Sequence, residues 1–335
     1  IVDFSSKLNK TGSFSGDLPV TSDKPRELKF QRSLTAPSIE FEGKSPKSSG
    51  CLFAEDDFIC LEGHTSDVID LCWDAFSGKI LSASIDSNVR LWNVSENDRI
   101  KTCIGTYKHP EPVSAVLFHP KFTQVFMSGC LDGKVRLWDS LNNRVLNFKD
   151  TKDSITAVQF SPDGRLVAVG LLQGRVIFYG EDLKFYSQIE CKNRKGPMKA
   201  GRAVTGLHFR PQFNFVPSTA TLSLPYEEVL VTTADSRLRL YSTETWEMIA
   251  KYKGHKHDGM HMGARFSEDG RYIISGSEDN RACIWFTTPT EGSGWGSLRG
   301  GTLDVHASFH VSEAPENNAG ESIDASSASF VPFNA

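Results

Sequence analysis

A segment that runs from a Gly-His or similar start to an aromatic residue recurs along this chain, and this repeat limits the possible folds more than any other feature. Each copy contains three short runs of alternating apolar and polar residues, separated by turn dipeptides such as Ser-Gly and Asp-Gly, which predicts strands joined by tight turns. A fourth run follows each copy, for example FYSQIEC before Lys192. Four strands in a unit of about 40–45 residues are typical of a β-propeller blade. The copies are Gly63–Trp92, Lys108–Trp138, Asp153–Tyr179, an interrupted copy that ends at Tyr241, and Gly254–Trp285.

A turn aspartate recurs before the third predicted strand, and Gln173 replaces it in one degenerate copy. Five copies in a row predict an all-β propeller with five full four-stranded blades. The aspartates are Asp86, Asp132, Asp235 and Asp279. We expect blades at about 61–107, 108–150, 151–191, 201–253 and 254–290.

The domain organisation follows from composition outside the repeats. Residues 1–55 are rich in Ser, Lys, Pro and Gly without a sustained period, which indicates a disordered or weakly ordered arm. Residues 56–335 form the predicted propeller. The chain starts with Ile1 rather than Met, so we expect a piece of a longer protein.

The repeats resemble the WD-repeat family in their Gly-His start, in the aspartate before the third strand and in the tryptophan that ends this strand. The resemblance implies a network of His, Ser, Asp and Trp inside a blade. Buried indole and imidazole N–H groups need acceptors, and a hydroxyl and a carboxylate supply them. By position the networks are His64, Ser82, Asp86 and Trp92; His109, Ser128, Asp132 and Trp138; and His255, Ser275, Asp279 and Trp285. The blades that end at Tyr179 and Tyr241 depart from this pattern, so we expect them to depend more on apolar packing.

Several stretches also resemble the family of WD repeat-containing protein 44, whose members are rabphilin-like, Rab-binding WD proteins. They lie between Leu61 and Trp285, and the most specific one is VIFYGEDLKFYSQIECKNRKGPMKAGRAVTG. The resemblance implies a seven-bladed ring, of which this chain would be a fragment with partial blades at both ends. FICLEG, which ends at Gly63, would be the outer strand of a preceding blade, and residues 303–335 would form a further partial blade. It also implies a peripheral scaffold in membrane trafficking or at organelle contacts, with small GTPase-linked partners.

Composition excludes several other classes of protein. The formal net charge is −4 and the pI about 6.2, so no global field attracts nucleic acid, and we expect no nucleic-acid partner. The seven cysteines form no CxxC pair, which favours reduced thiols in the cytoplasm over a disulfide framework. No apolar run reaches the roughly 18 residues that a membrane span needs. We therefore expect a cytoplasmic protein, peripheral on endomembranes.

The candidate binding site is the loop KNRKGPMKAGR, which joins one predicted blade to the next on the top face of the propeller. It has five basic residues and no acidic one: Lys192, Arg194, Lys195, Lys199 and Arg202. Such a loop suits anionic lipid headgroups or an acidic peptide, although it could equally be a solvated connection. Other proteins or peptides are expected on the same face. The insertion at 212–227, on the opposite face, carries Phe213, Phe215 and Leu224, which could contact a partner or pack on a neighbouring blade.

Catalysis, metals and cofactors are not expected. A Ser-His-Asp set could suggest a hydrolase triad, but here it repeats and ends in a tryptophan, whereas a triad needs one exposed copy with an oxyanion hole. His255, His257 and His261 with Asp258 could suggest zinc, but His255 belongs to a predicted network. We therefore predict a non-catalytic scaffold for membrane trafficking or membrane contact. The alternatives are a soluble adaptor of a nuclear or ubiquitin-type complex and, less favoured by the residues, a hydrolase on a propeller frame.

Overall fold

A computed structural model describes residues 60–74, 76–94, 102–192, 201–211, 228–259 and 262–287, together with the backbone of 301–303 and 307–310. The chain divides into two units, Ile1–Ile59 and Cys60–Ala335, and all described residues belong to the second. The arm predicted at 1–55 and the insertion at 212–227 therefore lie outside the described residues.

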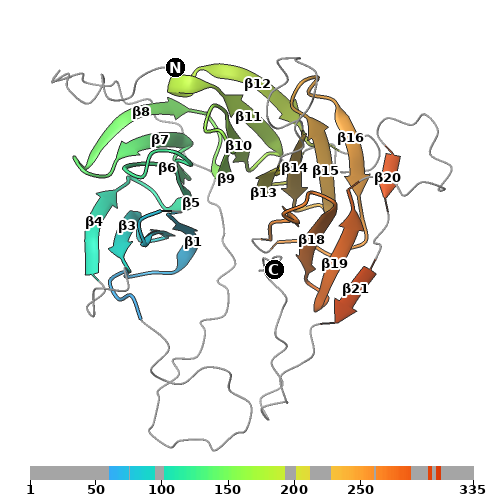
Figure 1. The fold of residues 1–335 in the computed structure, drawn as a ribbon, viewed down its shortest axis with the longest axis horizontal. Helices are drawn as coiled ribbons and strands as arrows, with labels where there is room; N and C mark the ends of the chain where they lie inside the picture. The colour runs from blue at the N-terminus through green and yellow to red at the C-terminus, as the bar shows by residue number, and fades with distance from the viewer. Residues whose placement is uncertain are drawn as a thin grey trace, which may run out of the picture. The chain divides into compact units, whose positions relative to one another are not determined.

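The described strands form five sheets that follow one another in chain order, each of them antiparallel apart from one added strand (Figure 1). The first two sheets contain β1 (Val68–Trp73), β2 (Lys79–Ser84), β3 (Asn88–Asn93) and β4 (Thr102–Lys108), then β5 (Val113–Phe118), β6 (Val125–Cys130), β7 (Lys134–Asp139) and β8 (Arg144–Asp150). The third contains β9 (Ile155–Phe160), β10 (Val167–Leu171), β11 (Arg175–Tyr179) and β12 (Phe185–Glu190), with the short 3-10 helix η3 (Glu181–Leu183) before β12. The fourth contains β13 (Val204–Phe209), β14 (Glu228–Thr233), β15 (Arg237–Ser242) and β16 (Met248–Tyr252). This arrangement confirms the predicted all-β propeller of four-stranded blades, and the described sheets form an unclosed one.

The fifth sheet differs from its predicted range. It contains β17 (Arg265–Phe266), β18 (Tyr272–Ser277), β19 (Arg281–Phe286) and β21 (Ala307–His310), so its outer strand lies beyond residue 290. Residues 307–310 were expected in a further blade at 303–335, but they pair with β19. The sequence hides this pairing because the other sheets join their third and fourth strands by much shorter connections. At the other end, Cys60–Gly63 form no strand, although FICLEG was expected to be one.

The same tight turn joins the second and third strands of all five sheets. The residue after the turn aspartate, or after Gln173, has a positive φ in every case: Ser87 (64°), Gly133 (76°), Gly174 (76°), Ser236 (55°) and Asn280 (59°). The aspartate stabilises this turn, since the Asp86 carboxylate accepts a hydrogen bond of 2.9 Å from the Asn88 amide. Asp132 does the same for the Lys134 amide at 2.9 Å. The recurrence of the aspartate therefore has a local cause, the capping of a turn that needs a left-handed residue.

Adjacent sheets are joined by apolar clusters and by side-chain bonds between inner strands. Leu81, Val89 and Tyr107 of the first sheet pack with Val116 and Phe126 of the second. Hydroxyls of three inner strands each donate to a carbonyl in the neighbouring sheet: Ser114 to Ile155 (2.6 Å), Thr156 to Val204 (2.5 Å) and Thr205 to Met262, which precedes β17 (2.7 Å). These bonds set β5, β9, β13 and the segment before β17 beside one another, and the inner strands of all five sheets line a central channel.

Candidate functional site

The central channel contains a cavity of about 680 Å³, and the inner strands of all five sheets line it. At its wall a few polar residues differ in type from the residues at the matching positions of the other inner strands. They are Asp70, Cys72, Gln159 and Arg265, with His208 in the adjoining pocket. An enzyme on a propeller frame would need a set of polar residues that does not repeat between blades. The chemistry of these five side chains therefore decides whether their role is catalytic or structural.

The geometry of this set favours a structural role. Burial raises the pKa of the Cys72 thiol to about 11, and its sulfur accepts the Phe118 amide at 3.4 Å. Burial lowers the pKa of His208 to about 4, and its Nδ1 accepts the Phe266 amide at 3.2 Å. A protonated thiol is a weak nucleophile, and a histidine of such low pKa is a weak base at neutral pH. Both side chains instead bond an inner strand to its neighbour.

Asp70 joins sheets in a similar way. Its carboxylate accepts the Val116 amide of the second sheet at 2.8 Å and the Leu71 amide at 2.9 Å. Burial raises the pKa of Asp70 to about 6 against the opposing effect of these two bonds and of Arg265. The carboxylate therefore accepts hydrogen bonds from backbone amides of two sheets, which is a structural role.

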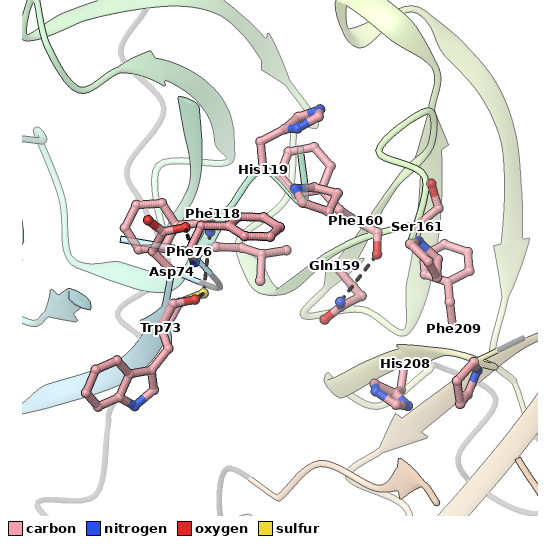
Figure 2. Close-up of a pocket in the computed structure, with 15 residues that line it drawn as sticks. Trp73, Asp74, Phe76, Phe118, His119, Gln159, Phe160, Ser161, His208 and Phe209 are labelled. Atoms are coloured by element: carbon pink, nitrogen blue, oxygen red, sulfur yellow. Dashed lines mark hydrogen bonds between the residues drawn. The ribbon is translucent and has the colours of Figure 1, made fainter. Parts of the chain in front are cut away.

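A smaller pocket of about 280 Å³ lies at one end of the inner strands, and Figure 2 shows its lining. Phe118, Phe160 and Phe209 come from three successive sheets and are buried. Trp73 and Phe76 also line it, and they are 65% and 74% exposed. Large exposed apolar side chains beside a pocket are typical of a surface that contacts protein rather than of a catalytic centre.

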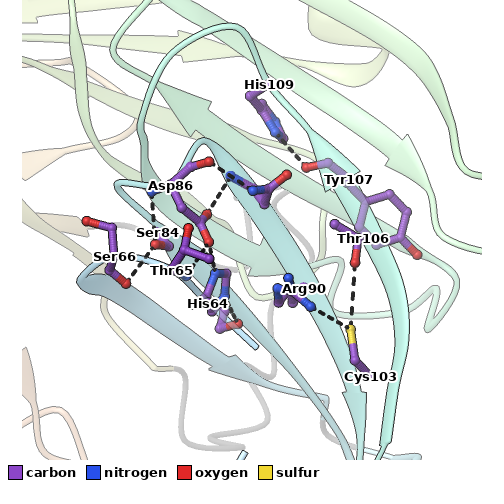
Figure 3. A network of polar contacts seen from close by, with 12 residues as sticks. His64, Thr65, Ser66, Ser84, Asp86, Arg90, Cys103, Thr106, Tyr107 and His109 are labelled. Carbon is purple, nitrogen blue, oxygen red and sulfur yellow. Dashed lines mark hydrogen bonds and ion pairs between the residues drawn. The ribbon is translucent and has the colours of Figure 1, made fainter. Parts of the chain in front are cut away.

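The predicted His-Ser-Asp-Trp set meets in the first sheet. His64 lies 2.8 Å from the Asp86 carboxylate through Nδ1, as Figure 3 shows, and 2.6 Å from the Ser82 hydroxyl through Nε2. The Trp92 indole donates to the same hydroxyl at 2.8 Å. Burial works to raise the pKa of Asp86, but hydrogen bonds from His64, Thr65 and Asn88 outweigh it and hold the pKa at about 2.

In the second sheet the set is only partly assembled. His109 Nε2 lies 2.8 Å from the Ser128 hydroxyl, and Trp138 donates to this hydroxyl at 2.9 Å. Asp132 was expected beside His109, but it forms an ion pair with Arg136. His109 Nδ1 lies instead 3.0 Å from the Tyr107 carbonyl. The guanidinium can offer two charge-assisted donors to the carboxylate, and a neutral imidazole offers one uncharged donor.

In the fifth sheet the expected network is absent. Trp285 donates to the Lys253 carbonyl at 3.0 Å, and the Ser275 hydroxyl donates to the Gly276 carbonyl at 3.0 Å. Asp279 pairs with Arg281. His255 is buried, and neither of its ring nitrogens has a hydrogen-bond partner. The expectation of a complete network here is wrong because Trp285, Ser275 and Asp279 each have another partner.

A buried ion pair that the sequence reading missed lies in the fourth sheet. Arg239 is 1% exposed and lies 2.6 Å from the Asp235 carboxylate, and it also donates to the Thr233 hydroxyl. The signal was present in the chain, since Asp235 and Arg239 have the same four-residue spacing as Asp132 and Arg136. That spacing places a guanidinium of the third strand beside the turn that precedes it.

The structure describes only the two ends of the basic loop. Lys192 forms an ion pair of 2.7 Å with Glu190, which lowers the pKa of that carboxyl. The backbone of Arg202 lies against Gly174, where an added Cβ would be 2.8 Å from the Arg202 carbonyl oxygen. Arg194, Lys195 and Lys199 lie outside the described residues. The loop thus begins and ends next to the β10–β11 turn, and Lys192 at its start is paired with Glu190.

Metal binding and membrane insertion gain no support from the described ranges. No three His, Cys, Asp or Glu side chains gather there in a way that could hold a metal ion. No described helix is long and apolar enough to cross a bilayer. The six cysteines in the described part of the chain are free thiols.

The chain was compared with known families and proteins. The family of the WD domain, G-beta repeat, matches residues 58–93, 101–139, 142–179 and 246–285. The chain is 35% identical to WD repeat-containing protein 44 of Xenopus laevis over 72% of its length, and 26% identical to 2-deoxy-glucose resistant protein 2 of Saccharomyces cerevisiae over 80%. It is 24% identical to the Denticleless protein homolog of Danio rerio over 67%. The matched regions span 25%, 34% and 38% of these relatives. The chain is a WD-repeat β-propeller protein that resembles WD repeat-containing protein 44.

Proposed function

We propose that this chain is a cytoplasmic scaffold that joins partner proteins to the surface of endomembranes, in membrane trafficking or at membrane contacts. WD-repeat proteins are generally non-catalytic and bind other proteins, and the WD domain family matches this chain. The propeller would hold the partners, including small GTPase-linked ones, and the loop at 192–202 would contact anionic headgroups.

The observation that carries the membrane part of the proposal is the charge of this loop. It has five cations and no acidic residue, and it connects two rigid strands, β12 and β13. A basic residue near an anionic membrane surface contributes about 1 kcal/mol to binding. Since Glu190 pairs with Lys192, the contribution of the loop is tested at Arg194, Lys195 and Lys199.

Flotation with vesicles of stated composition tests this proposal. Vesicles of phosphatidylcholine alone are compared with vesicles that also contain phosphatidylserine and a phosphoinositide. The triple variant Arg194→Ala, Lys195→Ala, Lys199→Ala should lose on the order of 100-fold in affinity for the anionic vesicles, given about 1 kcal/mol for each cation. Lys192 stays unchanged because its pairing with Glu190 reduces its expected contribution.

A matched variant controls for the loss of three charges. Lys121, Arg165 and Lys184 are exposed in described turns that precede β6, β10 and β12, at the strand ends opposite to the loop, and their replacement by Ala removes the same net charge. This control should retain vesicle binding to within a few-fold. If the loop variant floats as well as the unmodified chain, the membrane role is contradicted. The soluble adaptor of a nuclear or ubiquitin-type complex then becomes the better proposal, with the pocket near Trp73 and Phe76 as its first candidate surface.

A further inference from the structure

The outer edge of the fourth sheet is occupied by a strand from a distant part of the chain. β20 (Gly301–Leu303) lies parallel to β16, with Gly301 opposite Ala250 and Leu303 opposite Tyr252 (Figure 1). We propose that this edge is a strand-addition site for an extended segment of a partner protein, which β20 occupies until the partner displaces it. This surface is separate from the basic loop and does not depend on lipid binding.

The edge has the properties that strand addition needs. The outer strand of a sheet presents a row of backbone donors and acceptors, and proteins use such edges to bind extended peptides. Among the described sheets, those that end in β4, β8 and β12 carry no fifth strand, and only β16 does. The seated strand shows that the β16 edge is accessible and can pair with a segment that is not its neighbour in the blade.

The pairing of β20 has the features of an exchangeable contact. It covers three residue pairs and is parallel, whereas the pairing of β15 with β16 in the same sheet is antiparallel and longer. Parallel pairs are slightly less stable per residue. β20 also belongs to the connection between β19, which ends at Phe286, and β21, which starts at Ala307. β21 pairs independently with β19, so release of β20 need not break the fifth sheet.

The register indicates what a partner segment would look like. Ala250 and Tyr252 are buried in the cluster that contains Leu238 and Phe266, so the neighbouring positions suit a small residue and an apolar residue, as Gly301 and Leu303 are. Lys251 lies between them. Burial lowers its pKa, Arg239 and Arg237 lower it further, and Asp235 acts against them. An acidic residue close to the small and apolar pair would complement the charge of Lys251, and Asp304 follows Leu303 in this chain.

A peptide competition experiment on the full chain tests the proposal. The probe is a fluorescein-labelled peptide with the sequence of residues 299–306, RGGTLDVH, and its binding is followed by fluorescence anisotropy. A segment tethered in the same molecule competes at an effective concentration in the millimolar range. The variant Thr302→Pro removes a backbone donor from β20 and disfavours its pairing. It should therefore bind the peptide at least tenfold more tightly than the unmodified chain.

Two controls separate strand addition from other effects. Ser297→Pro makes the same substitution in the connection but outside β20, and it should leave peptide affinity unchanged. A peptide with N-methyl groups at its Thr and Leu keeps the side chains and loses backbone donors, and it should not bind. Equal affinity of the Thr302→Pro variant and the unmodified chain, or undiminished binding of the N-methylated peptide, overturns the proposal.

Hydrogen exchange gives a readout that does not depend on the variant folding correctly. On the unmodified chain, a saturating amount of the peptide should speed amide exchange at 301–303 while residues 248–252 stay protected. Unchanged exchange at 301–303 means that β20 is not displaced, and it also overturns the proposal. A failure of vesicle flotation leaves both results untouched, so the two proposals can fail separately.

Discussion

The Ser82 hydroxyl connects two large side chains in the first sheet. It lies 2.6 Å from His64 Nε2 and accepts the Trp92 indole at 2.8 Å, and the serine is 3% exposed. Ser275 is equally buried at the matching position of the fifth sheet, but its hydroxyl donates to the Gly276 carbonyl. The same residue type therefore has different partners in two copies of one repeat.

This difference predicts unequal costs for the same substitution. Ser82→Ala leaves the indole and the imidazole without their shared partner, and each unsatisfied buried group costs about 1–3 kcal/mol. We expect a loss of about 2–4 kcal/mol in the free energy of unfolding, measured by urea denaturation. The matched Ser275→Ala should lose about 1 kcal/mol, because it removes one ordinary hydrogen bond. Equal losses would contradict the network geometry described for the first sheet.

Sequence spacing located the network residues better than it assigned their partners. It placed His64 with Ser82 and Trp92, and the three meet in the structure. It could not show that Arg136 would take Asp132 away from His109, because the spacing of a repeat contains no information on competition between two cationic or polar donors. That outcome depends on which side chain reaches the carboxylate with better geometry.

At the scale of the element, the turn between the second and third strands also sets the position of a buried charge. Asp235 lies in the turn between β14 and β15 and Arg239 lies on β15, so the strand register brings the two together. The carboxylate is 11% exposed and the guanidinium 1%. Desolvation works to lower the pKa of Arg239, and Asp235 raises it above its ordinary value.

Removal of one partner should therefore be costly. Asp235→Ala leaves a buried guanidinium without its carboxylate, for which about 3–5 kcal/mol is typical. Asp150→Ala serves as the control, since Asp150 pairs with Lys152, whose side chain is 82% exposed, and such pairs contribute about 0–1 kcal/mol. Thermal denaturation of both variants checks the prediction. A loss below 1 kcal/mol in Asp235→Ala would show that the pair adds little to the fourth sheet.

The strands were the most predictable elements, with the exception of the blade to which β21 belongs. Alternation and turn residues correctly predicted strands such as β6 and β12, because short connections keep neighbouring strands adjacent in the chain. β21 was assigned to the wrong blade because a long connection separates it from β19. A local pattern identifies a strand but does not reveal which distant edge it pairs with.

At the scale of the whole molecule, four histidines are held neutral in the described sheets. Burial lowers the pKa of His109, His119, His208 and His255 to about 4 in each case. The unfolded chain has an ordinary histidine pKa of about 6.5. Because the folded state resists protonation, stability is fully present above pH 6.5 and falls as the pH decreases from about 6.5 towards 4.

We therefore predict that the unfolding midpoint drops between pH 6.5 and pH 4.5. Each fully buried histidine contributes up to about 3 kcal/mol to this drop, since one pKa unit corresponds to about 1.4 kcal/mol. His255→Leu removes a titrating group that has no hydrogen-bond partner, so it should flatten the pH dependence without a large loss at pH 7.5. His109→Leu should also lower stability at pH 7.5, because it breaks the bond to Ser128. A flat profile in the unmodified chain would exclude this account.

The bonds between inner strands have a consequence for how this array comes apart. Ser114, Thr156 and Thr205 each hold one inner strand to the neighbouring sheet, so a sheet in the middle is fastened on two sides. In repeat proteins stability is close to a sum of unit terms and nearest-neighbour terms. Disorder should therefore begin as fraying at the first or last sheet and move inward. A partner bound across two adjacent sheets would add a further contact between them. It would therefore slow this fraying without contacting any of the three hydroxyls.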